Sequence, residues 1–437
     1  MNNKIPDNFC MAPWTHAMHD THYVRRLCCI SAEPPEYLRS SYISLEEFKN
    51  SDYVKDIRKQ MMAGIMPRDC EWCDINAGKQ GHVDLYKDTF NRWLGTYYNE
   101  ALSKTDKDGH TTMDTKNFDY RFGDICNFKC RHCSSRSSSQ IKHEEQQYDI
   151  VPAWGNQSIP FDTNSADDLL LNELLSAADK GDIQLIQWIG GEPLFSEHHW
   201  KAMNYLNDNC DCSNIELSYI TNLSIIEFKG KKLVDLVKNF RNVHIHASIE
   251  SGGISAEYIR TGMNWAKWKD NFKQIKTAFD TINSTTPSSI NFVIAPGITL
   301  TTFSLPGLAE FLDLLIENNS DLCNVTFHKP NPNNVHFDID SLGPYKKMWL
   351  DEFLKIVESR RSLLKPRTYF DLIKAHKLLL SQKEFDFDNL ENKNFQNQLK
   401  RSVEWANKTD TIRKTYAADV IKDYPFMVEW WTKLNSL

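Results

Sequence analysis

From position 118 to about position 335, short apolar runs alternate with longer stretches that repeat apolar residues at helical spacing. The predicted strands are residues 118–125, 183–189, 215–220, 243–249, 290–295 and 325–328. The predicted helices between them are residues 167–180, 197–209, 231–240, 265–283 and 305–318. This alternation indicates parallel strands joined by right-handed crossovers. Because there are too few units for a closed eight-unit barrel, the sequence predicts an α/β fold, a partial (β/α)6 barrel of the TIM-like kind.

The segments on either side of this region have other patterns. The N-terminal segment is helical at its centre, where Ser44 and Glu47 have the spacing of a capping box. A polar stretch almost without apolar residues follows and predicts a linker. The predicted parts are an N-terminal cysteine-rich domain 1–102, a linker 103–117, the barrel 118–335 and a helical C-terminal extension 336–437.

Composition narrows the class of protein. In 437 residues, 41% are hydrophobic and 25% are charged, which excludes wholesale disorder. No apolar run approaches the roughly 18 residues of a membrane span, and the first residues lack the apolar segment of a secretory signal. The sequence therefore predicts a cytoplasmic protein without membrane contact. The net charge of −7 does not favour binding to nucleic acid.

Three of the eleven cysteines, Cys126, Cys130 and Cys133, follow the first predicted strand within eight residues. Thiolates at this spacing can bind three irons of a [4Fe–4S] cluster and leave the fourth iron open. An open coordination position is typical of a catalytic metal site. The alternative is a zinc site in which His132 or His143 is the fourth ligand.

A second group of cysteines lies near the N-terminus: Cys10, the adjacent pair Cys28 and Cys29, and then Cys70 and Cys73. A Cys-x2-Cys pair with two cysteines upstream supplies four thiolates. That number is enough for a closed zinc site or for a complete [4Fe–4S] cluster. Spacing alone does not distinguish these metals.

Three further strands of the predicted barrel also end in residues that can bind a ligand. The second strand is followed by Gly190-Gly191-Glu192-Pro193, the third by Thr221-Asn222-Leu223 and the fourth by Ser248-Ile249-Glu250. Arg260 follows shortly afterwards. In barrels of parallel strands the ligand lies at these C-terminal strand ends, so the motifs are expected at one face.

In this order, the cysteine loop and the motifs that follow it resemble the signature of the radical S-adenosylmethionine (SAM) superfamily. The resemblance implies a [4Fe–4S] cluster on Cys126, Cys130 and Cys133, whose open iron binds the methionine part of SAM. It also implies reductive cleavage of SAM to a 5′-deoxyadenosyl radical, which abstracts a hydrogen atom from a substrate. The electron donor that goes with this chemistry is a flavodoxin-type or ferredoxin-type protein.

The resemblance also implies roles for individual residues in SAM binding. Glu192 is expected to accept hydrogen bonds from the ammonium group, and Gly190 and Gly191 to allow close backbone approach. Arg260 is expected to bind the carboxylate. The remaining SAM contacts implied are Asn222, Ser248, Glu250 and, near the adenine, His132. Leu223 departs from the family pattern, because it stands where a glycine is usual.

The N-terminal cysteines, beginning with Phe9-Cys10-Met11-Ala12-Pro13-Trp14, resemble the twitch domain, a shorter relative of the SPASM domain. The resemblance implies an auxiliary [4Fe–4S] cluster on Cys10, Cys28, Cys70 and Cys73. Two features depart from the pattern: Tyr23 replaces a glycine, and the domain precedes the barrel. Relatives with such a domain often modify peptides or proteins, so a substrate of this kind is our first expectation. A small-metabolite dehydrogenase or rearranging enzyme is the second, and a zinc-stabilised binding protein without catalysis is the third.

Overall fold

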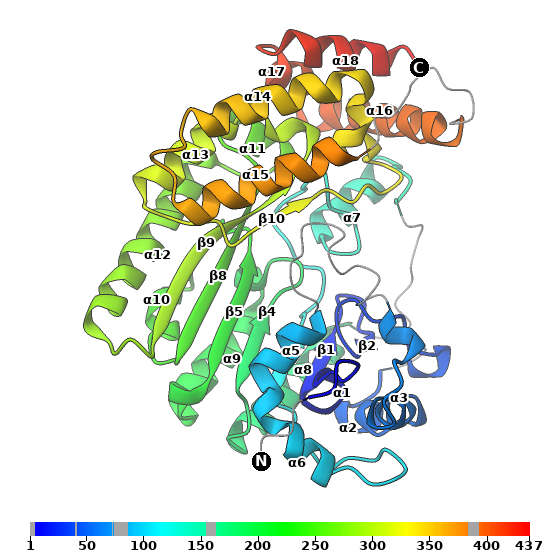
Figure 1. Ribbon diagram of the computed structural model, residues 1–437, viewed down its shortest axis with the longest axis vertical. Helices are drawn as coiled ribbons and strands as arrows, with labels where there is room; N and C mark the ends of the chain where they lie inside the picture. The colour runs from blue at the N-terminus through cyan, green and yellow to red at the C-terminus, as the bar shows by residue number, and fades with distance from the viewer. Residues whose placement is uncertain (1–4, 40–41, 72, 74–85, 154–162, 383–392) are drawn as a thin grey trace.

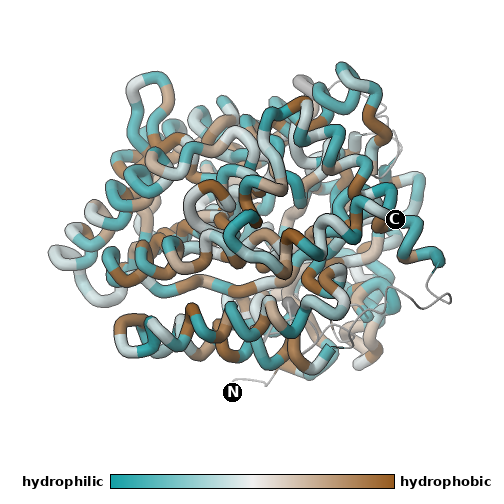
Figure 2. The backbone as a smooth tube through the Cα atoms, turned by 90° about the horizontal axis from the view of Figure 1, so that it is seen from above, coloured by the Kyte–Doolittle hydropathy of each residue, from teal (hydrophilic) through white to brown (hydrophobic). Residues whose placement is uncertain are grey.

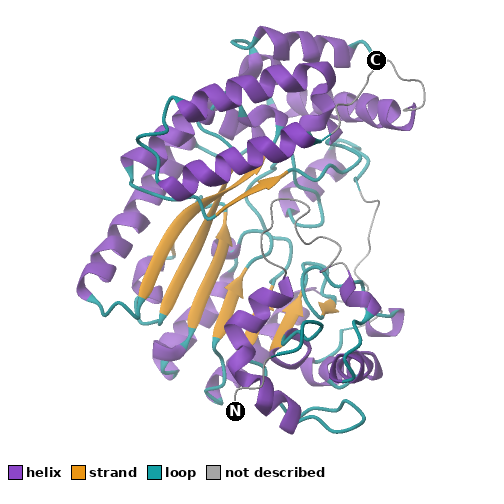
Figure 3. Cartoon of the chain, viewed as in Figure 1, coloured by secondary structure: helices purple, strands orange, loops and turns teal. Residues whose placement is uncertain are grey.

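A computed structural model describes residues 5–39, 42–71, 73, 86–153, 163–382 and 393–437. One large twisted sheet runs through the protein, with helices packed on its outer side (Figures 1 and 3). The helices alternate hydrophobic and hydrophilic residues, as is usual for helices with one face in a core (Figure 2). Among the described helices, none is both long and apolar enough to cross a membrane.

All six predicted strands are present and lie side by side in parallel. They are β3 (Asn117–Tyr120), β4 (Leu185–Trp188), β5 (Glu216–Thr221), β8 (Asn242–Ile249), β9 (Asn291–Leu300) and β10 (Asn324–Phe327). The order in the sheet is β10-β9-β8-β5-β4-β3-β1-β2. The prediction of an α/β fold built as a partial parallel barrel is therefore confirmed.

Two strands that the sequence did not predict extend this sheet. Strand β1 (His16–His19) pairs in parallel with β3, and β2 (Arg25–Arg26) pairs antiparallel with β1. Both strands are very short, and neither contains an apolar run. The N-terminal segment thus contributes directly to the barrel sheet. A separate antiparallel pair consists of β6 (Glu227–Phe228) and β7 (Lys231–Lys232).

The helices that follow the barrel strands lie close to their predicted positions. They are α8 (Thr163–Asp179), α9 (Glu197–Asn209), α10 (Leu233–Val237), α12 (Trp265–Thr285) and α13 (Leu308–Glu317). Two shorter helices lie near the cysteine loop: α7 (Ser139–Gln147) follows it in the sequence, and α11 (Gly253–Ile259) meets it in space through a hydrogen bond from the Arg131 amide to the carbonyl of Ile259. The C-terminal helices are α14 (Lys346–Glu358), α15 (Pro366–Ser381), α16 (Lys393–Arg413), α17 (Ala417–Ile421) and α18 (Pro425–Asn435).

The N-terminal region has a hydrophobic core of its own. Its helices are α1 (Ala12–Thr15), α2 (Leu45–Lys49), α3 (Asp52–Met62), α5 (Tyr86–Leu94) and α6 (Tyr98–Ser103). Phe9, Trp14, Ile57 and Met113 are buried members of this core. Ser44 and Glu47 form the predicted capping box at the start of α2.

Residues 103–117, predicted as a linker, are packed against this N-terminal core. Met113 is fully buried, and buried Arg58 donates a hydrogen bond to the carbonyl of Gly109 at 2.8 Å. A Cβ atom at Gly109 would lie 2.3 Å from the Lys55 carbonyl oxygen, so the loop passes close to α3. The polar composition of this segment did not predict its contacts with the N-terminal core, because these contacts are made largely by its backbone.

Candidate active site

The loop that carries Cys126, Cys130 and Cys133 follows β3 and is fixed by backbone hydrogen bonds. Lys129 and Arg131 donate to the carbonyls of Thr261 and Ile259, each at 2.8 Å. Burial raises the pKa of the Cys126 thiol to about 11 and that of the Cys130 thiol to about 12. The neighbouring thiols raise these pKa values further, because a second thiolate close by disfavours ionisation. The loop thus brings its three thiols together.

Two buried arginines join this loop to the C-terminal helix α16. Arg131, fully buried, forms an ion pair with Asp410 at 2.8 Å, and its guanidinium lies 4.0 Å from the centre of the Tyr258 ring. Arg413 binds Glu144 of α7 through its Nη2 atom at 2.5 Å and donates from Nη1 to the carbonyl of Lys129. Neither contact could be predicted from the sequence, because a charge on a distant helix gives no local signal.

The Gly190-Gly191-Glu192 turn lies directly against the cysteine loop. A Cβ atom at Gly191 would lie 2.2 Å from the carbonyl oxygen of Ile125, so only glycine fits there. The backbone amide of Glu192 donates to that same carbonyl oxygen at 2.8 Å. The turn therefore holds Glu192 next to the first cysteine of the loop.

The carboxylate of Glu192 is buried and accepts three hydrogen bonds. The donors are the hydroxyl of Thr221 and the backbone amide of Asn222, both at 2.6 Å, and the amide of Leu194 at 3.0 Å. Burial raises the pKa of Glu192 to about 7, although these hydrogen bonds and the charge of Arg260 act in the opposite direction. Glu192 is thus a buried acid that titrates near neutral pH.

Asn222 joins the end of β5 to the cysteine loop. Its amide donates to the side-chain oxygen of Asn127 at 3.0 Å and lies 4.0 Å from the sulfur of Cys126. Leu223, which replaces the usual glycine, has φ of +54° and is fully buried. The chain thus keeps a left-handed conformation suited to glycine with a leucine in its place.

Arg260 and Glu250, both predicted to contact SAM, bind each other. Arg260 donates from Nε and Nη2 to the two carboxylate oxygens at 2.6 and 2.5 Å, and its Nη1 lies 3.8 Å from the sulfur of Cys130. His132 also faces Glu250, at 3.5 Å, and burial lowers the pKa of this histidine. Ser248 is half-buried at the end of β8. The fork of Arg260 is therefore already occupied, and only Nη1 faces the cysteines.

The four cysteines predicted as auxiliary ligands line one small cavity in the N-terminal region. Cys10, Cys28, Cys70 and Cys73 all border it. Burial raises the pKa of the Cys28 thiol to about 11, and Cys70 and Cys73 are near enough to raise it further. Cys29 instead is exposed and borders a different cavity. The structure thus brings together the predicted set that contains Cys28.

Tyr23, the second residue that replaces a usual glycine, has φ of +61°. It is buried, and its hydroxyl lies near Gly123 in the loop after β3. The turn therefore has the backbone conformation that a glycine would adopt, although the residue is a tyrosine.

The donor atoms fit iron–sulfur clusters by their chemistry. Each of the two groups consists of thiols alone, three in the barrel loop and four in the N-terminal cavity, as such clusters require. For a single metal ion, the described part of the chain contains no group of three His, Cys, Asp or Glu side chains that could hold it.

The chain thus combines a partial parallel barrel with a three-cysteine loop that follows β3. The sequence model described as the radical SAM superfamily matches residues 120–304, which is less than half of the chain. The match contains the cysteine loop and every predicted SAM contact. Among curated proteins, the comparison gives no match.

Solved structures with a similar chain path include two proteins. One is SuiB from Streptococcus suis bound to the precursor peptide SuiA, at 12% identity and a TM-score of 0.36, covering 82% of this chain and 71% of SuiB. SuiB bound to S-adenosylmethionine is similar over 71% of this chain and 60% of that chain, at 11% identity and a TM-score of 0.34. The other is TYW1 with a lysine-pyruvate adduct bound, at 12% identity and a TM-score of 0.30, covering 57% of this chain and 72% of TYW1.

Proposed function

We propose that this protein is a radical SAM enzyme with a second, auxiliary [4Fe–4S] cluster. One observation carries the proposal: within the segment that matches the superfamily, the cysteine loop contacts both the Gly190-Gly191-Glu192 turn and Arg260. A [4Fe–4S] cluster held there by Cys126, Cys130 and Cys133 would supply the electron for reductive cleavage of SAM, and the resulting 5′-deoxyadenosyl radical would abstract a hydrogen atom from the substrate.

Different residues of the chain have different roles around that cluster. Cys126, Cys130 and Cys133 hold it, and Glu192 accepts hydrogen bonds from the ammonium group of SAM. Arg260 donates from Nη1 to the Cys130 sulfur, which compensates part of the negative charge of the thiolate. Glu250 holds Arg260 in this orientation. Asn222, Ser248 and His132 complete the SAM site from the ends of neighbouring strands and from the loop itself.

Cys10, Cys28, Cys70 and Cys73 hold the auxiliary cluster in this proposal. Support comes from the cavity that these four residues line, and from Phe90, which borders both this cavity and the larger one inside the barrel. An auxiliary cluster held by these four thiols would supply an acceptor for the electron left after hydrogen abstraction, or it would orient the substrate. A flavodoxin-type or ferredoxin-type protein supplies the first electron.

A peptide or protein is the first candidate substrate, because the N-terminal cysteines resemble the twitch domain. A small metabolite is the second candidate. Deuterium transfer from labelled candidate substrates into 5′-deoxyadenosine distinguishes them, since only the true substrate donates its hydrogen.

The test of the reaction class uses anaerobically reconstituted protein. Wild-type protein should bind about eight irons and, with strong reductant, convert SAM to 5′-deoxyadenosine. Replacing Cys126, Cys130 and Cys133 together by Ala should remove about half of the iron and all of this conversion. Cys210→Ala is the matched control, because this half-buried thiol lies outside both groups, and it should behave as wild type. If the triple variant still formed 5′-deoxyadenosine, the proposal would fail.

A further inference from the structure

A cavity of about 530 Å³ lies inside the partial barrel, and none of the predicted SAM or cluster ligands lines it. Its walls come from the inner face of the sheet, from α5 and from α15 of the C-terminal extension. The volume lies within the range of small-molecule sites, roughly 300–1,000 Å³. It can therefore hold a small molecule or one or two residues of a peptide, but no folded domain.

One end of this cavity lies beneath the candidate SAM site. Ile189, which lines it, directly precedes Gly190, and Arg121, also in the lining, is 3.3 Å through its Cβ atom from the position of a Cβ at Gly190. A molecule in the cavity thus lies next to the turn that holds Glu192. This is where a substrate must be to lose a hydrogen atom, so the inference rests on the proposed function.

The cavity offers apolar surface that is otherwise open to solvent. Ile220 and Trp93, two of its lining residues, are among the large hydrophobic side chains that remain exposed, at 42% and 41%. Phe90 and Phe327 add to the same lining. A ligand with an apolar portion would gain free energy by covering these side chains.

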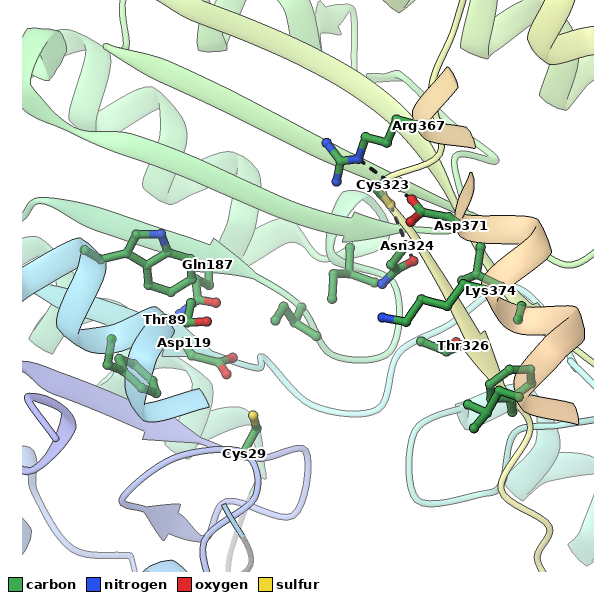
Figure 4. A pocket seen from close by; sticks show the side chains of 18 of the residues that line it. Cys29, Thr89, Asp119, Gln187, Cys323, Asn324, Thr326, Arg367, Asp371 and Lys374 are labelled. Carbon is green, nitrogen blue, oxygen red and sulfur yellow. Dashed lines mark hydrogen bonds and ion pairs between the residues drawn. The ribbon is translucent and has the colours of Figure 1, made fainter. Parts of the chain in front are cut away.

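Among the described residues, one of the cations that line the cavity has no partner. Arg121 binds Asp119 through two hydrogen bonds, at 3.0 and 3.1 Å, and Arg367 lies 3.8 Å from Asp371. Lys374, on the same side of α15, has neither an ion pair nor a hydrogen bond within the described residues. It extends from α15 into the cavity, opposite the side that carries Gln187 and Asp119 (Figure 4).

His16 adds no second positive charge to the cavity at neutral pH. Burial lowers its pKa to about 4, so the ring is neutral at pH 7, and its Nδ1 atom has no hydrogen-bond partner in the described structure. The cavity therefore combines an apolar surface, one unpaired ammonium group and one unsatisfied neutral ring nitrogen. An oxyanion is the group that Lys374 would bind most strongly.

We propose that this cavity binds the substrate, and that Lys374 anchors a carboxylate or phosphate group carried by a part of the substrate next to an apolar portion. Arg367, two helical turns before Lys374 on α15, lies on the same wall, where Asp371 compensates its charge. The C-terminal extension, which lies outside the segment that matches the superfamily, then determines which substrates are accepted.

The test uses two small oxyanions as probes, glutarate and inorganic phosphate, with the full-length protein carrying its clusters and SAM. Binding is measured by saturation-transfer NMR for glutarate and by ³¹P line broadening for phosphate. Lys374→Met should weaken binding of the preferred probe about tenfold and Lys374→Glu should weaken it further, whereas Lys374→Arg should retain it. Lys377→Met is the matched control, because Lys377 is an exposed lysine of α15 outside the cavity lining, and it should bind like wild type.

Preference for glutarate assigns a carboxylate substrate, and preference for phosphate assigns a phosphorylated one. Three results would overturn the assignment. They are wild-type affinity for the probe in Lys374→Met, equal losses of affinity in Lys374→Met and Lys377→Met, and no binding of either probe to the wild-type protein. Uncoupled formation of 5′-deoxyadenosine by wild-type protein and by Lys377→Met tests the proposed function separately. If these two proteins cleave SAM but substitution of Lys374 does not change the affinity for either probe, only the assignment of the cavity fails.

Discussion

The two groups of cysteines are assembled in different ways. The barrel group comes from eight consecutive residues, and its loop is tied to α11, α7 and α16 by backbone bonds and buried arginines. The N-terminal group comes from three separate places in the first 73 residues, which a small core of its own brings together. A local loop can keep its geometry when other parts of the protein change, whereas a composite site depends on the packing of its whole region.

The largest effect expected from this difference concerns the N-terminal group. Changing Cys70 and Cys73 to Ala should remove about half of the iron and abolish turnover of the substrate, yet leave uncoupled formation of 5′-deoxyadenosine intact. The reason is that these thiols line a cavity separate from the barrel loop. Iron analysis and product analysis of the same preparation measure both effects.

Loss of a metal site can unfold a small region, so circular dichroism must accompany this measurement. Normal substrate turnover by a folded Cys70→Ala, Cys73→Ala variant would mean that the N-terminal group serves only stability.

The next largest effect concerns how the barrel loop is held. Asp410→Ala leaves the guanidinium of Arg131 buried without its carboxylate, and removing one partner of a buried pair costs about 3–5 kcal/mol. We expect a loss of this size in the free energy of unfolding in urea, together with loss of iron from the barrel site.

Arg360→Met is the matched control for this prediction. Arg360 pairs with Asp313, whose side chain is 50% exposed, and exposed pairs contribute about 0–1 kcal/mol. Equal losses in Asp410→Ala and Arg360→Met would show that burial of the Arg131 pair has no special weight.

A smaller effect is expected at Glu192, which is not a cluster ligand. A charged hydrogen bond typically contributes about 1.5–3 kcal/mol, so Glu192→Gln should weaken SAM binding by roughly ten- to a hundredfold. The iron content should stay at the wild-type level. Anaerobic equilibrium binding of SAM gives the affinity, and a loss of iron would instead assign a structural role to the Gly190-Gly191-Glu192 turn.

The smallest expected effect is a pH dependence of the same contact. Because burial raises the pKa of Glu192 to about 7, the carboxylate gains its charge as the pH rises through 7. Arg260 faces this group and lowers its pKa, but burial outweighs that charge. Affinity for the SAM ammonium should therefore rise by about tenfold between pH 6 and pH 8. Glu192→Gln should remove this rise, and an unchanged profile in the variant would assign the titration to another group.

The raised pKa of Glu192 has the opposite effect on stability: SAM affinity should rise with pH, whereas the contribution of Glu192 to stability should fall. The folded state holds the proton of Glu192 more tightly than the unfolded chain, whose glutamate titrates near 4.5. The contribution of this group to stability is therefore largest below pH 4.5 and falls as the pH rises towards 7.

The sequence predicted those parts of the fold whose signal is local. The six barrel strands were predicted from apolar runs, and the grouping of the three barrel cysteines was predicted from their spacing. Strands β1 and β2 were missed because four and two residues without an apolar run carry no periodic signal; pairing with β3 specifies them instead. The same limit applied to residues 103–117, where backbone contacts determine the packing.

Among the candidate site residues, contacts between side chains were harder to predict than the strand ends on which these residues lie. Arg260 and Glu250 were each assigned to SAM, but the structure pairs them with each other, because two opposite charges ten residues apart converge only in the folded barrel. The glycine-like backbone at Leu223 and Tyr23 was also not predictable, since neither side chain favours positive φ.

The pairing of β1 with β3 has a consequence for the order in which the protein is made. The ribosome synthesises His16 about a hundred residues before Asn117, so β1 has no partner strand until that later segment has emerged. Cys10 and Cys28 lie on either side of β1 and β2 in the sequence, in a region whose own core precedes β3. A chain stalled before β3 could therefore pack this core while one edge of β1 still lacked its partner strand.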